Sequence, residues 1–98
     1  MIAKTVTVTV EGDGGGQFRI HGPQATARSE NAAGAIAEAE AMARASARSA
    51  VLEMGGEEPE IRVSIERYFL PDAVDENGLL AAEVTAEAAS RPVVHETI

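Results

Sequence analysis

Residues 30–54 predict one long helix whose apolar positions are mostly alanine. The stretch contains no proline and is dense in Ala, Glu, Arg and Met, which are strong helix formers. Its apolar positions recur every three or four residues and define one narrow stripe, formed by Ile36, Ala39, Ala43, Ala47, Ala50 and Met54. Ser29 is the expected N-cap, Glu30 is expected in the first turn, and Gly55-Gly56 is expected to end the helix. Because small side chains let a helix approach a sheet closely, the large core side chains must come from strands.

Four segments alternate between apolar and polar residues, which is the pattern of half-buried strands. They are residues 2–11, 18–21, 61–70 and 79–88. A glycine-rich loop joins the first two as a hairpin, and residues 24–29 are expected to be a polar connector. A small irregularity is expected where Tyr68, Phe69 and Leu70 end the third segment. In the last segment, the side chains expected to face the helix are Leu80, Ala82, Val84 and Ala86.

The order strand-strand-helix-strand-strand indicates an α+β fold, a two-layer ββαββ sandwich. One long alanine-rich helix would pack on an antiparallel or mixed four-stranded sheet. We expect residues 1–90 to form a single domain and residues 91–98 a C-terminal tail, since Pro92 disfavours a strand there. One helix covers only one face of a sheet, so the other face, or an edge strand, is free for assembly. The side chains expected on that other face are Thr5, Thr7, Thr9, Arg62, Ser64, Glu66, Glu83, Thr85 and Glu87.

The apolar composition predicts a thin core. Of 44 apolar residues, 19 are alanine, so only 25 side chains are large enough to fill an interior. Alanine contributes little buried area per residue, and burial against a partner chain would supplement such a core. A partner chain is therefore part of the expectation for this sequence.

The net negative charge of the chain lies in its second half. The formal net charge is -8, and residues 50–98 contain three basic and eleven acidic groups. With no cluster of Lys or Arg, we expect neither a nucleic-acid partner nor a membrane partner. The absence of cysteine excludes a disulfide framework and a cysteine nucleophile. No segment resembles a signal peptide or a membrane span, so a cytoplasmic location is expected.

No motif carries a catalytic signature, and we expect no catalytic residue, no cofactor and no enzymatic activity of the chain alone. The one candidate for metal ligation is an oxygen-rich loop containing Asp72, Asp75 and Glu76, but it lacks the spacing of an EF-hand. Turn chemistry explains these residues equally well. The glycines after Glu11 join two strands without a lysine, which favours a hairpin turn over a phosphate loop. The two histidines, His21 and His95, are interpreted as solvated side chains.

The second half of the chain resembles the small C-terminal region of the hydantoinase/oxoprolinase family's A-type subunit. The resemblance runs through AIAEAEAMARASARSAVLEMGG, then EEPEIRVSIERYFLP, then a loop, then LLAAEVTAEAASRP. In that family an alanine-rich helix precedes an acidic strand, and the last strand closes with V-x-A-x-A and Gly-Arg-Pro. The matching residues of that last strand are Val84, Ala86, Ala88, Arg91 and Pro92. Ser90 stands where the family has glycine, and Phe18-Arg19-Ile20 is similar to its F-R-V strand.

The resemblance implies a non-catalytic accessory small subunit of a larger ATP-dependent amidohydrolase or carboxylase complex. The family's nucleotide and metal residues lie in its large domains, so no catalytic residue carries over to this chain. The expected partners are then larger protein subunits. Two alternatives remain: a free-standing homo-oligomeric module for small-molecule binding or interaction, and a small enzyme that uses the loop of Asp72, Asp75 and Glu76.

Overall fold

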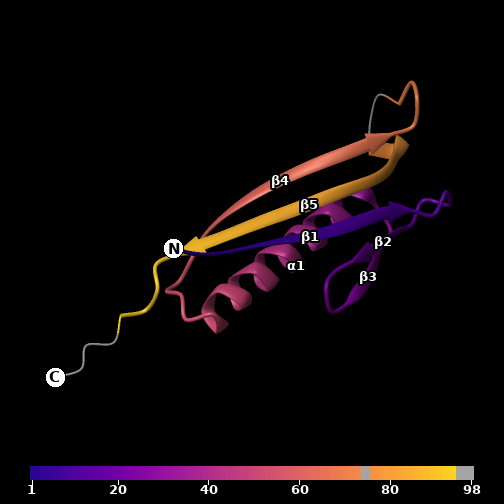
Figure 1. Ribbon diagram of the computed structural model, residues 1–98. Coiled ribbons are helices and arrows are strands. Elements are labelled where there is room, and N and C mark those ends of the chain that lie inside the picture. The colour runs from indigo at the N-terminus through magenta and orange to yellow at the C-terminus, as the bar shows by residue number, and fades with distance from the viewer. Residues whose placement is uncertain (74–75, 95–98) are drawn as a thin grey trace.

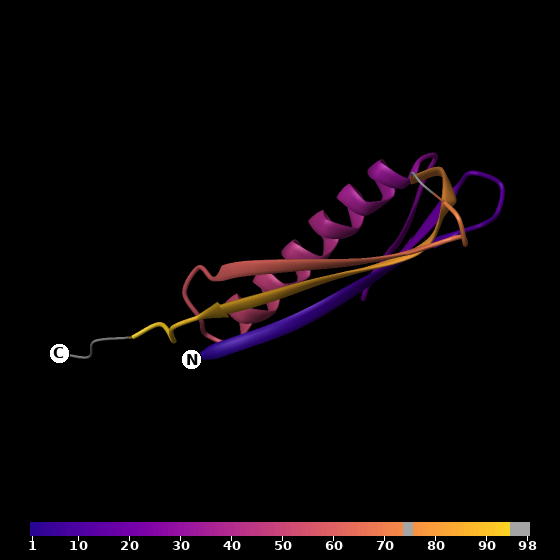
Figure 2. The ribbon, with the colours of Figure 1, turned by 90° about the horizontal axis from the view of Figure 1, so that it is seen from above.

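A computed structural model describes residues 1–73 and 76–94 as an α+β fold with one helix and five strands. The strands form a single antiparallel sheet in the order β3-β2-β1-β5-β4. The helix lies on one face of that sheet, so the molecule has two layers (Figures 1 and 2). In chain order the elements are β1 (Ile2–Gly12), β2 (Phe18–His21), β3 (Thr26–Ser29), α1 (Ala32–Glu53), β4 (Glu60–Phe69), the short 3₁₀ helix η1 (Glu76–Gly78) and β5 (Leu79–Ser90).

The fifth strand corrects the expectation of a four-stranded ββαββ sheet. Residues 26–29, expected to be a connector, form β3 and pair antiparallel with β2. The turn between them is closed by a hydrogen bond from the backbone N–H of Gly22 to the carbonyl of Ala25 (2.9 Å). An edge strand needs no buried side chains of its own, so its polar sequence carries no strand signal.

The two longest strands, β1 and β5, lie at the centre of the sheet. Their pairing runs from Ile2 opposite Ser90 to Glu11 opposite Ala81. By contrast, β2 pairs with β1 only over Thr9–Gly12. The expected alternation of β1 is confirmed, since Val6, Val8 and Val10 are buried while the threonines between them point away from the helix. The expected hairpin between β1 and β2 is also confirmed.

The helix begins two residues later than expected. Asn31 is the N-cap, and its side-chain Oδ1 accepts a hydrogen bond from the backbone N–H of Gly34 (2.6 Å). Ser29 instead ends β3, and Glu30 precedes the helix, so no acidic residue lies in the first turn. The expected end is confirmed: Gly55 has φ +88°, and Gly56 donates from its N–H to the carbonyl of Val51.

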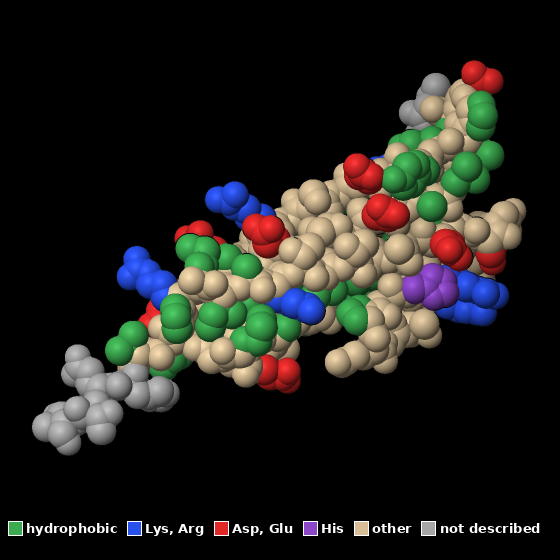
Figure 3. Space-filling model, in the orientation of Figure 1, with side chains coloured by type: hydrophobic (Ala, Val, Ile, Leu, Met, Phe, Trp, Pro, Cys, Tyr) green, Lys and Arg blue, Asp and Glu red, His purple; other side chains and the backbone are tan. Residues whose placement is uncertain are grey.

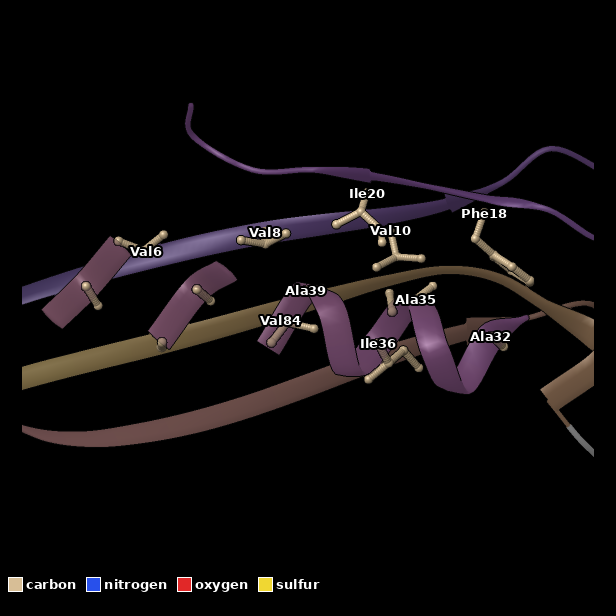
Figure 4. Packing of buried hydrophobic residues seen from close by; sticks show 14 of the residues in the cluster. Val6, Val8, Val10, Phe18, Ile20, Ala32, Ala35, Ile36, Ala39 and Val84 are labelled. Carbon is tan, nitrogen blue, oxygen red and sulfur yellow. The ribbon is translucent and has the colours of Figure 1, made fainter. Parts of the chain in front are cut away.

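The core lies between α1 and the three middle strands, and alanine makes most of the helix's side of it. The buried helix residues are Ala32, Ala35, Ile36, Ala39, Ala43, Ala47 and Val51. Figure 4 shows the first four of them, Ala32, Ala35, Ile36 and Ala39, facing the strand residues Val6, Val8, Val10, Phe18, Ile20 and Val84. Near the helix end the expected stripe is wrong: Val51 is buried, whereas Met54 is about half exposed. From Ala39 to Val51 the buried residues are spaced by four. Because an α-helix has 3.6 residues per turn, a row with this spacing winds slowly around the helix.

A bulge near the start of β5 changes which leucine enters the core. Leu79 is buried and Leu80 is 47% exposed, which corrects the expectation that Leu80 faces the helix. The register shifts there, since Tyr68 lies opposite Ala81 but Phe69 lies opposite Leu79. The extra residue on β5 reverses the alternation, as β-bulges do. The irregularity expected near Tyr68 and Phe69 is thus confirmed.

Residues after β5 lie against the turn that follows the helix. Gly56 forms an isolated bridge with Pro92, and the backbone N–H of Val93 donates to the carbonyl of Gly55 (2.7 Å). The described part of the chain is elongated, with a radius of gyration of 16.3 Å, against about 13 Å for a compact chain of 100 residues. A thin, extended shape leaves much of the sheet without a second covering layer.

Candidate functional site

The face of the sheet away from α1 is polar and solvent-exposed, and we call it the open face. It carries the side chains expected there: Thr5, Thr7, Thr9, Arg62, Ser64, Glu66, Glu83, Thr85 and Glu87. They stand in rows across the three strands β1, β5 and β4. In the middle row, Thr7 and Thr85 share a hydrogen bond between their hydroxyl oxygens (3.1 Å), and Ser64 lies next to them. This row leaves the centre of the open face uncharged.

Charged side chains flank that central row unevenly. On one side Arg62 lies opposite Glu87, and on the other Glu66 lies directly opposite Glu83. Like charges opposite one another on neighbouring strands are destabilising. Glu66 accepts a hydrogen bond from the hydroxyl of Tyr68 (2.8 Å), which raises the pKa of that hydroxyl because the carboxylate favours the protonated phenol. Across the described parts of the chain, no cation forms an ion pair with Glu66.

Strand β4 forms one edge of the sheet and is the second feature of the site. It pairs with β5 on one side, and Figure 1 shows no described strand or helix on its other side. It spans Glu60–Phe69, ten residues, whereas the opposite edge strand β3 has four. A long edge exposes a row of unpaired backbone N–H and C=O groups, which is a template for another strand. The free edge of β4 is therefore the more extensive of the two.

The helix covers β4 only in part. Ile61, Val63 and Ile65 point to the helix side and pack against the core, yet each stays half-buried. The helix lies over β1 and β5, so the side of β4 remote from β5 receives no cover from it (Figure 2). These three aliphatic side chains give the free edge an apolar border on one face, while the open face is polar.

A second exposed apolar group lies at the end of the sheet where a loop joins β4 to β5. Figure 3 shows hydrophobic side chains gathered around that loop. Its members are Tyr68, Phe69, Leu70 and Leu80, each at least 40% exposed. The bulge described above places Leu80 there. The sequence pattern missed this cluster, because strict alternation assigns Leu80 to the core.

A hollow of about 520 Å³ lies beside the start of β4 and is lined mostly by exposed, charged side chains, including Glu57, Glu58, Glu60, Arg62 and Glu87. At its border the Arg48 Nε donates to Oε1 of Glu58 (2.6 Å), which connects α1 to the segment before β4. This hydrogen bond lowers the pKa of the Glu58 carboxyl and raises that of the Arg48 guanidinium. The hollow offers no sheltered group for acid–base chemistry.

The Glu58 contact predicts a pH-dependent contribution to stability. The folded pKa of Glu58 lies below its ordinary value of 4.5, so the contribution is complete above that value and is lost as the pH falls through the folded pKa. We expect Glu58→Gln to lower the melting temperature at about pH 7 and to match the wild type at about pH 2. Thermal melts followed by circular dichroism measure this. Glu57→Gln, at an exposed position without an ion pair to Arg48, is the control, and an equal loss in both variants would contradict the assignment.

The oxygen-rich loop offers no assembled metal site in the described residues. Asp72 is exposed and has φ +67°, in a turn where Ala73 donates from its backbone N–H to the carbonyl of Leu70. Asp75 lies outside the described residues, and of Glu76 only the backbone is described, as the start of η1. Within residues 1–73 and 76–94 no three His, Asp or Glu side chains are grouped to hold a metal ion.

Of the two histidines, the structure describes His21. His21 lies on β2 with its Nε2 3.7 Å from Oε2 of Glu11, and His95 lies outside the described residues.

The glycine-rich loop is a turn: Oδ1 of Asp13 accepts hydrogen bonds from the N–H groups of Gly15 and Gln17, which lower the pKa of Asp13. In the described part of the chain, no helix has the length and apolar character needed to cross a membrane.

The fold and its surface thus define a two-layer α+β domain with an open polar sheet face and a free edge strand. Comparisons with protein-family models, with curated proteins and with solved structures find no match for this chain.

Proposed function

We propose that the protein is a non-catalytic interaction module that acts by associating with other protein chains. The observation that supports this best is the combination of the exposed open face with the ten-residue free edge of β4. Both are surfaces that a second protein layer or strand covers. The thin alanine-rich core and the elongated shape support it too, since both leave apolar area that a partner buries.

The resemblance described above supplies a candidate partner for this module. Under it, the chain is an accessory small subunit of a hydantoinase/oxoprolinase-type ATP-dependent amidohydrolase or carboxylase complex, in the cytoplasm. The reaction takes place on the larger chains, and this chain contributes a surface rather than a reacting group. Because residues 50–98 carry the whole net negative charge of the chain, the partner surface that meets β4 and β5 is neutral or basic.

Co-expression tests this form of the proposal. The large A-type chain of this class encoded in the same genome is produced with the tagged small chain, and size-exclusion chromatography with light scattering follows. We expect one complex containing both chains, and Glu87→Arg on the open face is expected to weaken it. Glu38→Arg, an exposed change of the same charge on α1, is the control. Separate elution of the two chains would overturn the heteromeric form.

The same complex tests the alternative of a small enzyme. A triple variant, Asp72→Asn with Asp75→Asn and Glu76→Gln, removes the loop carboxylates without touching the open face. We expect the turnover of the complex to be unchanged by it. A loss of turnover with the complex intact would place chemistry on this chain.

A free-standing homo-oligomeric module remains the second candidate function. One observation favours it: the charges along β4 are ordered so that two antiparallel copies of this strand place Arg62 of one copy opposite Glu66 of the other.

A further inference from the structure

The order of residues in β4 is self-complementary about Ser64. Directly opposite residues of an antiparallel pair point to the same face of the sheet. If Ser64 lies opposite Ser64 of a second copy, Arg62 lies opposite Glu66 of that copy. Two-fold symmetry repeats the contact, so the open face gains two pairs of opposite charges.

The helix side of the same register is also complementary. Val63 lies opposite Ile65 of the second copy, and the reverse pair follows by symmetry. Both side chains are half-buried in the single chain, because α1 does not reach the outer side of β4. Ile61 meets Arg67, whose aliphatic stem covers apolar surface while its charged end stays in water. The apolar border of β4 is thus buried in this register.

Neighbouring registers lack this match. Centring the pair on Val63 places Glu60 opposite Glu66, which is a pair of like charges. Centring it on Ile65 places Val63 opposite Arg67 and forms no ion pair. A register that places Ser64 opposite Val63 or Ile65 of the second copy sets the apolar side of one copy beside the polar side of the other.

Neither Glu66 nor Arg62 forms an ion pair within the described residues of the single chain. Glu66 lies opposite the like charge of Glu83, and Arg62 lies opposite Glu87 without forming an ion pair with it. Pairing about Ser64 gives each Glu66 a guanidinium on its outer side. Charged side chains often protect a sheet edge from pairing. Here the order Arg62, Ser64, Glu66 favours pairing instead, because two antiparallel copies of β4 place each of these charges opposite a charge of the other sign.

We propose that two copies of this chain pair through the free edge of β4, antiparallel and centred on Ser64. The two sheets then form one continuous sheet, with both helices on the same face. This rests on the proposed function, since both take the chain to act by association. The net charge of -8 on each copy opposes the dimer, but at about 0.15 M salt charges further apart than roughly 8 Å are screened, and the contacts across β4 are much closer.

Cysteine cross-linking tests the register, and the chain contains no cysteine of its own. In Ser64→Cys the two thiols would lie directly opposite, with Cβ atoms about 5 Å apart. A short bifunctional thiol reagent is therefore expected to give a covalent product of twice 10.2 kDa. In Glu60→Cys, the two thiols would be about 27 Å apart, eight residues at roughly 3.4 Å each, and no product is expected. Failure of the first variant, or equal linking of both, would overturn the proposal.

Charge reversal tests the two ion pairs by sedimentation equilibrium at moderate salt. Arg62→Glu alone and Glu66→Arg alone are each expected to raise the dimer dissociation constant about tenfold or more, because each places like charges opposite one another. The double variant exchanges the charges and is expected to restore the wild-type constant. Arg28→Glu, exposed on the opposite edge strand β3, is the control and should change nothing. Circular dichroism confirms that each variant folds.

Two outcomes separate this proposal from the proposed function. A wild-type chain that is monomeric at all concentrations, yet co-elutes with the large chain, overturns the β4 dimer and leaves the interaction module standing. A double variant that stays as weak as the single ones also overturns the stated register. A chain that dimerises as described but binds no large chain overturns only the heteromeric form of the function.

Discussion

Replacing Ala43 with leucine is expected to destabilise the protein strongly, although leucine is itself a strong helix former. Ala43 has no exposed surface and lies where α1 faces the central strands. Leucine adds three carbon atoms where small side chains allow the close approach of helix and sheet. Overpacking of this kind costs about 1–3 kcal/mol and sometimes more, and each kcal/mol lowers the melting temperature of a domain this size by about 4–8 °C.

Ala41→Leu is the matched control, because Ala41 is exposed on the same helix. We expect it to change the free energy of unfolding by less than about 0.5 kcal/mol. Urea unfolding followed by circular dichroism measures both variants. Equal stability of the two would show that α1 does not approach the sheet through its alanine face.

Truncating Ile20 to alanine is expected to have a comparable or larger effect through the opposite cause. Ile20 is fully buried, and it lies opposite Val10 in the pairing of β2 with β1. Leucine- or isoleucine-to-alanine changes in a core cost about 2–5 kcal/mol, since they leave a cavity as well as losing buried area. A small domain has only about 5–15 kcal/mol in total, so this change uses a large share of it.

Leu80→Ala is the control for Ile20→Ala, and it also tests the bulge. The structure exposes 47% of Leu80, whereas unbroken alternation along β5 would bury it. We expect the control to cost well under 1 kcal/mol, as surface substitutions do. A loss as large as that of Ile20→Ala would mean that Leu80 packs in the core and that the register shift is absent.

The helix and the long strands follow closely from local patterns. Val6, Val8 and Val10 alternate with threonines, and the alternation alone places them on the buried side. The alanine stripe likewise identifies the buried helix face, from Ile36 to Ala47. These predictions succeed because each element buries one side, and burial of one side imposes a period on the sequence.

Elements whose side chains are not buried were not predictable in the same way. Thr26–Ser29 forms β3 through backbone pairing with β2, and Ala27 is its one apolar side chain that packs against the core, which is too little to indicate a strand in the sequence. Asn31 replaces Ser29 as the N-cap because β3 continues through Ser29 before the helix begins. The sequence indicates Asp72, Asp75 and Glu76 as metal candidates by residue type alone, and residue type does not bring ligands together in space.

Residue size and alternation along the sequence predict the class of the fold, its thin core and the polar character of one sheet face. These depend on side-chain size and on alternation, which are local properties. Three further features depend on the folded arrangement: β4 is an edge strand, its Ile61, Val63 and Ile65 stay partly uncovered, and Leu80 points outward. Strand order and register are set by pairing between distant segments, and a residue's own neighbours do not specify that pairing.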